Sequence, residues 1–399
     1  MYQPNKKLLK KYADVLIKFA LNDGKGVNEG EVVRVVIPES AKPLYGELQR
    51  AILESGAHPM MRYLPNGFNR QFYELANKDQ LEFFPKEFVK SRIDLINHTV
   101  AIIAEDNPHE LEGIDPKKIF MATKKTKLIR DWQFEKEQIG EYTSTIGLYG
   151  TPAKAKDAGL TLEQYWDQIE KACFLNEDDP IQKWKSILNK QEEIKKWLND
   201  LQINSVRIKS KNIDLVLKIG EERQWLGGGG RNIPSFEIFT SPDWRGTEGK
   251  ISLNKPLYRY GVKIEGISLE FSEGKVVKAI AKRNENMLKE MLSQKNADKI
   301  GEFSLTDSRM SNITEYMAET LFDENVGGQY GNTHVAVGMA YKEAYSGDST
   351  KLKESDWNNL GFNNSQIHAD VISTEDRVVT ATLENSEEVV IYRGGKFTL

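Results

Sequence analysis

Residues 31–64 read EVVRVVIPESAKPLYGELQRAILESGAHPMMRYL, and this stretch decides the fold class of the first half of the chain. Its opening residues are rich in valine, which predicts a short strand over Glu31–Ile37. Ser40 is placed to cap a helix that runs to about Glu54, and His58–Leu64 predicts the next strand. A strand, a helix and a second strand form a βαβ unit, which implies a parallel sheet with a right-handed crossover.

The residues that follow continue this alternation of helices and strands. An apolar stripe from Leu8 to Ala20 predicts an amphipathic helix before the βαβ unit. Two more strands are predicted over His98–Ala104, which is apolar throughout, and over Tyr142–Tyr149. The further predicted helices cover residues 68–81, 85–95, 116–136, 162–174 and 180–201. We therefore expect residues 1–200 to form an α/β domain with a parallel sheet.

The composition changes near Asp200. From Ile203 onward, short segments of β-forming residues alternate with glycine-containing turns. Helices are expected only over Lys278–Gln294 and Thr314–Phe322. We therefore expect residues 201–399 to form a second, β-rich α+β domain.

The composition excludes several classes of protein. With 39% hydrophobic and 29% charged residues, the chain has the composition of a globular protein. A net charge of −4 provides no basic face for nucleic acid, and no apolar run is long enough to span a membrane. The single cysteine, Cys173, fits a reducing compartment and leaves His, Asp and Glu as the ligands for any metal. We expect a cytoplasmic protein.

Three common motifs of catalysis are incomplete or missing. The segment WLGGGGR at residues 225–231 lacks the Lys-Ser/Thr ending of a phosphate loop and the glycine spacing of a dinucleotide site. We interpret it as a flexible turn between strands or as a close approach of the backbone near a site. The sequence contains no His-Glu-x-x-His helix and no Gly-x-Ser-x-Gly elbow. Any hydrolytic site must therefore be assembled from separated segments.

The segment between Gly331 and Asp370 carries two of the five histidines. His368 and Asp370 are two residues apart, so on an extended strand their side chains point to the same face. His334 lies in another β-forming segment, GNTHVAVGMAY. Imidazole and carboxylate on neighbouring elements suit Zn, Co or Mn, and this segment is therefore a candidate metal site.

Further candidate residues lie outside that segment. Glu237 and Glu302 interrupt apolar stretches, and a buried carboxylate needs a partner such as a metal ion. Asp323 and Glu324 end a predicted helix. Tyr341 follows His334 by seven residues, a spacing that places two side chains on one helical face. Each residue also has a structural explanation, as a solvent-facing carboxylate, a helix-end charge or a core tyrosine, and spacing leaves both interpretations open.

Several of these segments resemble the thermophilic metallo-aminopeptidase family, typified by aminopeptidase T, aminopeptidase S and the streptococcal peptidase PepS. The resemblance is carried in the second half by NIPSFEIFTSP, KIGEFSL, LFDENVGG, NTHVAVGMAY and NNSQIHAD, in that order. In the first half it is carried by IAEDNP, DWQFEKEQI and YGTPAKA, so it covers essentially the whole chain.

The resemblance implies a two-metal exopeptidase that removes N-terminal amino acids from short peptides. The family's metal ligands fall on Glu237, Glu302, His334, His368 and Asp370. Its Asp-Glu-Asn segment falls on Asp323-Glu324-Asn325, which makes Glu324 a further ligand or a general base, and its site tyrosine falls on Tyr341. Glu324 lies ten residues before His334, a longer gap than in the family pattern. The resemblance also implies a homodimer with a shielded site.

The roles we expect follow from two-metal chemistry. Two divalent ions, Zn, Co or Mn and with Mg also compatible, would share a water and lower its pKa. One ion would polarise the scissile carbonyl and the other would hold the substrate's free α-amine. We expect Glu302 to bridge the ions, Glu324 to act as general base and Tyr341 to donate to the developing oxyanion.

Two other functions are compatible with the same residues. A different two-metal hydrolase, such as a phosphoesterase or an amidohydrolase, would use a similar carboxylate-rich ligand set. A non-enzymatic α/β ligand-binding protein would carry the acidic residues as a solvated patch. A panel of aminoacyl amides and phosphate esters, together with a metal analysis, discriminates these readings.

Overall fold

The computed structural model describes residues 2–399, which form two compact units. The first unit contains the chain up to Leu188 together with Gly228–Ser235 and Tyr316–Leu321. The second unit contains Asn189–Gly227, Phe236–Glu315 and Phe322–Leu399. This division by contacts falls inside the helix α10 (Pro180–Asp200), and it assigns two short segments of the second half to the first unit. The domains expected at 1–200 and 201–399 remain a prediction.

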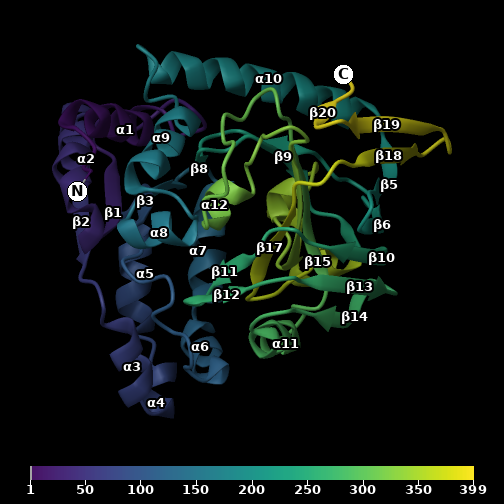
Figure 1. The fold of residues 1–399 in the computed structure, drawn as a ribbon, viewed down its shortest axis with the longest axis horizontal. Coiled ribbons are helices and arrows are strands. Elements are labelled where there is room, and N and C mark those ends of the chain that lie inside the picture. Colours follow the sequence, from purple (N-terminus) through teal and green to yellow (C-terminus); the bar gives the residue numbers. More distant parts are fainter. Residues whose placement is uncertain (1) are drawn as a thin grey trace. The chain divides into compact units, whose positions relative to one another are not determined.

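A parallel sheet of five strands organises the first unit, in the order β2-β1-β3-β4-β8 (Figure 1). Its strands are β1 (Val32–Pro38), β2 (His58–Leu64), β3 (His98–Ile103), β4 (Thr143–Leu148) and β8 (Asn232–Ile233). The expected βαβ unit is confirmed, because β1 and β2 pair in parallel and α2 (Lys42–Glu54) connects them. The predicted α/β class of this half is therefore correct.

Helices surround this sheet, and local capping explains several of their starts. The Asn5 side chain accepts a hydrogen bond from the Leu8 amide, and Thr161 and Gln164 form a capping box. The remaining helices of the first unit are α1 (Lys6–Lys18), η1 (Glu39–Ala41), α3 (Asn69–Leu75), α4 (Lys78–Glu82), α5 (Lys86–Leu95), α6 (Pro116–Thr123), α7 (Thr126–Gln138), α8 (Pro152–Asp157) and α9 (Leu162–Ala172).

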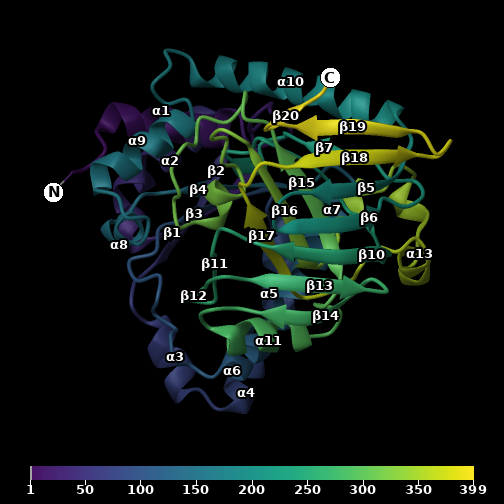
Figure 2. The ribbon, with the colours of Figure 1, turned by 45° about the vertical axis from the view of Figure 1, so that its right-hand side comes forward.

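An antiparallel sheet of eight strands forms one layer of the second unit, in the order β14-β13-β10-β6-β5-β18-β19-β20. Figure 2 shows most of these strands one above another. They are β5 (Ile203–Lys209), β6 (Ile213–Lys218), β10 (Asp243–Ser252), β13 (Ser268–Ser272), β14 (Lys275–Ile280), β18 (Val378–Leu383), β19 (Glu388–Arg393) and β20 (Lys396–Phe397). Alternating burial along β5 and β6 indicates that one face is packed and the other is more exposed.

A second antiparallel sheet of five strands lies deeper in the same unit, in the order β17-β16-β15-β9-β7. Its strands are β7 (Leu226–Gly227), β9 (Glu237–Thr240), β15 (Ile300–Thr306), β16 (Asn332–Gly338) and β17 (His368–Ser373). Every residue of β15, β16 and β17 is buried, so both faces of these strands are covered. Polar side chains on these strands therefore need partners inside the protein.

Smaller elements complete the second unit. A two-stranded ribbon is made of β11 (Leu257–Arg259) and β12 (Val262–Ile264). The helical elements are α11 (Glu285–Ser293), α12 (Thr320–Asp323), η2 (Lys342–Ala344), η3 (Ser349–Lys351) and α13 (Glu354–Asn359), of which α12 begins in the first unit. No helix within residues 2–399 is both long and apolar enough to cross a membrane.

Four predicted helices were wrong in extent. The helix expected over residues 68–81 is two helices, α3 and α4, because the backbone of Ala76 between them is extended. The helix expected over residues 116–136 is two helices, and Thr123, at the end of the first, bonds back to the Ile119 and Phe120 carbonyls. The start of the helix expected over Lys278–Gln294 is instead strand β14, because it pairs with β13. The helix expected over Thr314–Phe322 forms only its last turn, after Ala318 adopts a left-handed φ of 52°.

Candidate metal centre

The register of the inner sheet places five of the predicted site residues on one face. Glu237 pairs with Thr306, and His334 pairs with Ser304, so Glu237, Glu302 and His334 project to the same side of β9, β15 and β16. His334 and Asp370 are also on one face, because Ala336 pairs with Asp370. The predicted shared face of His368 and Asp370 on one strand is therefore confirmed by β17.

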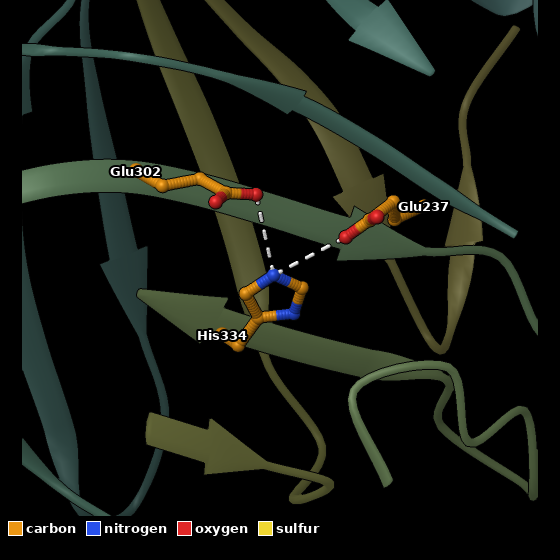
Figure 3. Close-up of side chains that lie close together, drawn as sticks. All are labelled: Glu237, Glu302 and His334. Carbon is orange, nitrogen blue, oxygen red and sulfur yellow. Dashed lines mark ion pairs between the residues drawn. The ribbon is translucent and has the colours of Figure 1, made fainter. Parts of the chain in front are cut away.

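Glu302 lies between the two histidines. Its Oε1 is 3.4 Å from His334 Nε2, and its Oε2 is 3.2 Å from His368 Nε2. Glu237 Oε2 approaches His334 Nε2 to 3.3 Å, and Figure 3 shows both carboxylates directed at this imidazole. Asp370 Oδ1 is 3.4 Å from His368 Nε2. One carboxylate thus joins a His334 side and a His368 side of the cluster.

Glu324 reaches the same cluster from outside the sheet. It follows the short helix α12 and groups its carboxylate with His334 and Asp370, all ligand atoms lying within 4.8 Å of one another. The same distance limit groups Glu237 with Glu302 and His334, and Glu302 with His368 and Asp370. The structure therefore brings all six predicted ligand residues into three overlapping groups.

Tyr341 lies beside the cluster, but for a different reason than its spacing suggested. His334 belongs to strand β16 and Tyr341 follows that strand, so the proposed helical face shared by the two residues was wrong. The Tyr341 ring instead packs edge-on against the His368 imidazole at 4.8 Å and against Phe239 at 5.5 Å. Its backbone N–H donates to the Ser241 hydroxyl at 2.8 Å.

The cluster concentrates negative charge in a buried place. The six residues are between 1% and 8% exposed. Burial, together with neighbouring carboxylates, raises the pKa of Glu324 well above its usual value and also raises that of Glu237. Burial opposes ionisation of Glu302 too, but hydrogen bonds from His334 and His368 lower its pKa. These opposite shifts are typical of carboxylates that compete for a limited amount of positive charge.

The histidines respond in the opposite sense. Burial disfavours their charged forms, yet the adjacent carboxylates raise the pKa of His368 to about 10 and that of His334 well above its usual value. The Asp370 pKa is lowered by His368 and His334 and further by Arg259 of β11, although burial opposes this. When all four carboxylates are ionised and both imidazoles are neutral, as metal binding requires, the cluster carries four negative charges.

These residues fit divalent metal ions. Carboxylate oxygens and imidazole nitrogens are a donor set for Zn, Co or Mn, and cations would balance the excess charge. His334 Nδ1 is buried and has no hydrogen-bond partner among residues 2–399, an arrangement that is costly unless a ligand or water engages it. Ions bound there would replace the protons on the imidazoles, because metal ligands must be deprotonated.

Two supporting groups were not predicted. The Met339 carbonyl accepts a hydrogen bond from His368 Nδ1 at 2.9 Å, which leaves Nε2 free to face Glu302 and Asp370. Arg259 contributes the charge that acts on Asp370. A backbone carbonyl carries no signal in the sequence, and Arg259 lies in a ribbon that no motif singles out.

Glu105 and His109 belong to the first unit, where Glu105 pairs with Lys154 Nζ at 2.7 Å and His109 Nε2 contacts Asp157 at 2.8 Å. The glycine-rich segment at 225–231 includes the short strand β7, which pairs with β9. The Cβ of any residue placed at Gly227 would lie 2.4 Å from the Glu237 carbonyl, so this glycine permits a close approach of two backbones.

Known proteins resemble this chain along its full length. The model of the thermophilic metalloprotease family M29 matches residues 5–397. The chain is 27% identical to aminopeptidase T of Thermus thermophilus over 417 residues, covering 99% of each chain. It is 26% identical to aminopeptidase AmpS of Bacillus subtilis over 413 residues, covering 98% of each.

A solved structure agrees with the fold. Wild-type AmpT from Thermus thermophilus superposes with a TM-score of 0.83 at 24% sequence identity, covering 99% of this chain and 100% of that chain. The agreement extends to the α/β and β-rich parts of the chain, so the predicted fold class is confirmed. The family match spans both units and includes every residue of the metal centre. The chain belongs to the M29 family of thermophilic metalloproteases.

Proposed function

We propose that this protein is an aminopeptidase that removes N-terminal amino acids from short peptides and uses two divalent metal ions. The observation that carries this proposal is the position of Glu302, whose two oxygens face two different imidazoles. A carboxylate in that position is suited to bridge two ions. The names of the relatives, aminopeptidase T and aminopeptidase AmpS, support cleavage at the N-terminal end of the peptide.

The residues divide between two ion positions. Glu237 and His334 would hold one ion, and His368 and Asp370 would hold the other, with Glu302 shared between them. Such ions, when bound, lower the pKa of a water and polarise a peptide carbonyl. One of the ions would also be able to hold the free α-amine of the substrate, which is the group that an aminopeptidase must recognise.

Glu324 is suited to proton transfer. It is placed beside His334 and Asp370, and its pKa is raised by burial and by the neighbouring carboxylates. A carboxylate with a raised pKa accepts a proton from water more readily near neutral pH and can pass it to the leaving amine. Its alternative role is that of a metal ligand, since it completes the third ligand group.

Tyr341 is suited to stabilise charge on the substrate. Burial and the surrounding carboxylates raise its pKa well above the usual value for tyrosine, so the hydroxyl keeps its proton. Packing against His368 and Phe239 restricts the ring. A protonated, restrained hydroxyl next to the metal centre is able to donate to the oxyanion that develops on the scissile carbonyl.

The N/O ligand set supports Zn, Co or Mn, with Mg also compatible, as the metal cofactors.

A homodimer and a cytoplasmic location are proposed from exposed phenylalanines and from the single thiol. Exposed phenylalanines on α3, α5 and the segments beside them would provide a contact for a second copy of the chain; they are Phe68, Phe72, Phe83 and Phe88. Cys173 is a free buried thiol, which fits the reducing cytoplasm.

A substrate panel tests the proposed reaction. Aminoacyl-nitroanilides, their N-acetylated counterparts and nitrophenyl phosphate esters are offered to the same metal-loaded preparation. We expect hydrolysis of the free-amine anilides only, because the acetyl group removes the amine that the centre must hold. Hydrolysis of the phosphate esters instead would assign the centre to a phosphoesterase. A metal-loaded protein that hydrolyses none of these substrates would refute the aminopeptidase assignment.

A further inference from the structure

The turn that carries Glu324 is attached to one rung of the inner sheet. In that rung Glu237 of β9 pairs with Thr306 of β15, which in turn pairs with Asn332 of β16. The turn consists of residues 323–325 and begins at Asp323, the last residue of helix α12. Each of the three strands contacts this turn through a hydrogen bond close to the rung.

Three bonds make this attachment. The Phe236 amide, at the start of β9, donates to Asn325 Oδ1 at 2.6 Å. Thr306 Oγ1 donates to the Glu324 carbonyl at 3.2 Å. Asn332 Nδ2 donates to the Asp323 carbonyl at 2.6 Å. Consecutive residues of the turn are therefore held by consecutive strands of the sheet.

Asn325 has a particular place in this set. Its side chain holds the amide of the residue before Glu237, while its own backbone follows Glu324 directly. Asn325 is fully buried, and its carbonyl accepts from the Ser311 hydroxyl. Loss of the side-chain oxygen would leave the buried Phe236 N–H without its acceptor, and such a group is strongly disfavoured. One side chain therefore relates the positions of two carboxylates of the metal centre.

We propose that Asn325 is a positioning residue that sets Glu324 and Glu237 relative to each other. This inference rests on the proposed two-metal function. Glu237 and Glu324 belong to the two ligand groups that contain His334, whereas the third group consists of Glu302, His368 and Asp370. Asn325 therefore acts on the ion beside His334 and leaves the ion beside His368 in place.

The same attachment explains how Glu324 reaches the centre despite the long gap to His334. The residues between the turn and β16 are 326–331, and they lie outside the rung. Because the turn is fixed directly to β9, β15 and β16, its position does not depend on the length of the loop that follows. The side chains of Asn325, Thr306 and Asn332 set the position of Glu324, and the number of residues between Glu324 and His334 matters less.

Metal titration of two variants tests this inference. Asn325→Ala removes the acceptor, and Asn199→Ala is the control, since Asn199 Oδ1 accepts the Trp225 amide at 2.7 Å elsewhere in the same unit. Chelator-stripped proteins are titrated with zinc, and the affinity of each ion is measured. We expect Asn325→Ala to bind one ion as the wild type does and the other at least about tenfold more weakly. The Asn199→Ala control is expected to bind both ions normally.

Hydrogen exchange of the metal-free proteins supplies a second readout. Peptides covering residues 320–326 and the Phe236 amide should exchange faster in Asn325→Ala than in Asn199→Ala. Asn325→Asp retains an oxygen that can accept the same N–H and should restore both the slow exchange and the affinity of the second ion. If Asn325→Ala does not fold, Thr306→Val, which removes only the bond to the Glu324 carbonyl, is measured in its place, and residues 320–326 should exchange faster in it than in Asn199→Ala.

Unchanged affinities for both ions would overturn the proposal. An equal weakening of both affinities would also overturn it, because it would indicate a general loss of stability and no specific effect on Glu237 and Glu324. An Asn325→Asp variant as defective as Asn325→Ala would also overturn it. If the wild-type protein itself binds no divalent ion, the proposed function fails. Even then, the exchange rates of the metal-free variants decide separately whether Asn325 holds the turn.

Discussion

At the scale of single residues, the centre separates groups that hold charge in place from a group that is suited to move a proton. Glu302 contacts two imidazoles and has a lowered pKa, as expected for a carboxylate that stays ionised. Glu324 has a raised pKa because it is buried near Glu237 and Asp370. Neighbouring carboxylates thus have opposite tendencies, which is how one site supplies both ligands and a base.

Substitution of Glu324 by glutamine tests the assignment of the base. The amide keeps the size of the side chain but cannot accept a proton from water. We expect kcat to fall by about 100-fold or more while both ions remain bound, since general bases contribute on that scale. Steady-state kinetics and metal analysis of the same preparation check this. A parallel loss of metal and rate would make Glu324 a ligand instead.

Substitution of Tyr341 by phenylalanine removes the hydroxyl and leaves the ring against His368 and Phe239. We expect kcat to fall by about 10- to 100-fold with little change in KM, because a donor to the oxyanion acts mainly in the transition state. Metal content and melting temperature should match the wild type. A change confined to KM would instead place the hydroxyl on the bound substrate.

The sequence predicted part of this site on physical grounds. His368 and Asp370 share a face because strands alternate, and that argument needs only their spacing. Glu237 and Glu302 were selected as carboxylates inside apolar stretches, and both are buried. Glu324 was a candidate from its place at the end of a predicted helix, but only the resemblance to a family gave it the role of ligand or base. The Met339 carbonyl that orients His368 has no signature in the side-chain sequence.

At the scale of elements, the centre depends on the register between β16 and β17. Gly338 pairs with His368, and its φ is 102°. A Cβ at this position would lie 2.1 Å from the Ile367 carbonyl oxygen. The backbone there cannot accept a side chain without shifting β17, and such a shift would move both His368 and Asp370.

Gly338→Ala is therefore expected to lower the free energy of unfolding by about 2 kcal/mol or more, from overpacking and backbone strain. The matched change is Gly46→Ala in helix α2, where a Cβ meets nothing within 4 Å. That change should stabilise the protein by about 0.5–1 kcal/mol, since glycine is unfavourable inside a helix. Urea unfolding of both variants measures the difference. A neutral Gly338→Ala would contradict the close approach of the two strands.

His98 of β3 gives the first unit a dependence on pH. It is buried between Glu31, at 2.8 Å from Nε2, and Thr143, at 2.8 Å from Nδ1. Burial lowers its pKa despite the opposing effect of Glu31. The unfolded chain therefore binds more protons below about pH 6.5, and stability is lost as the pH falls from there toward the folded pKa.

His98→Gln should remove this contribution. The free energy of unfolding is measured for both proteins between pH 5 and 7.5, where Glu31 stays ionised because its own pKa is lowered. We expect the wild type to lose more stability than the variant on going from pH 7 to 5. Titration of the metal-centre residues is common to both proteins and cancels in the comparison. Parallel pH profiles would show that His98 does not contribute.

Elements with strong local patterns were predicted with accurate limits, and those set by distant partners were not. His58–Leu64 matches β2 because its ends are marked by Gly56 and Pro65. Residues 278–280, expected at the start of a helix, belong to a strand because β13 is available to pair with them. Residues 314–319 are not helical, and Ala318 has a left-handed φ of 52°. No local sequence pattern predicts that conformation.

At the scale of the whole molecule, the metal centre draws on residues from Glu237 to Asp370. Four strands and one turn supply the six side chains, so no short motif contains the site. Composition limited the metal ligands to His, Asp and Glu, and the full-length family match agrees with a site assembled over long distances in the sequence. We expect removal of the metal to abolish the reaction while the protein remains folded.

The most direct test of this account is the hydrolysis of an aminoacyl-nitroanilide before and after chelation, with Zn, Co, Mn and Mg added back singly. The account predicts that activity disappears with the metal and returns when about two equivalents of one ion are bound per chain. Circular dichroism should show that the chelated protein remains folded. Full activity in a protein verified to be free of metal would contradict the account and make the histidine and carboxylate cluster structural.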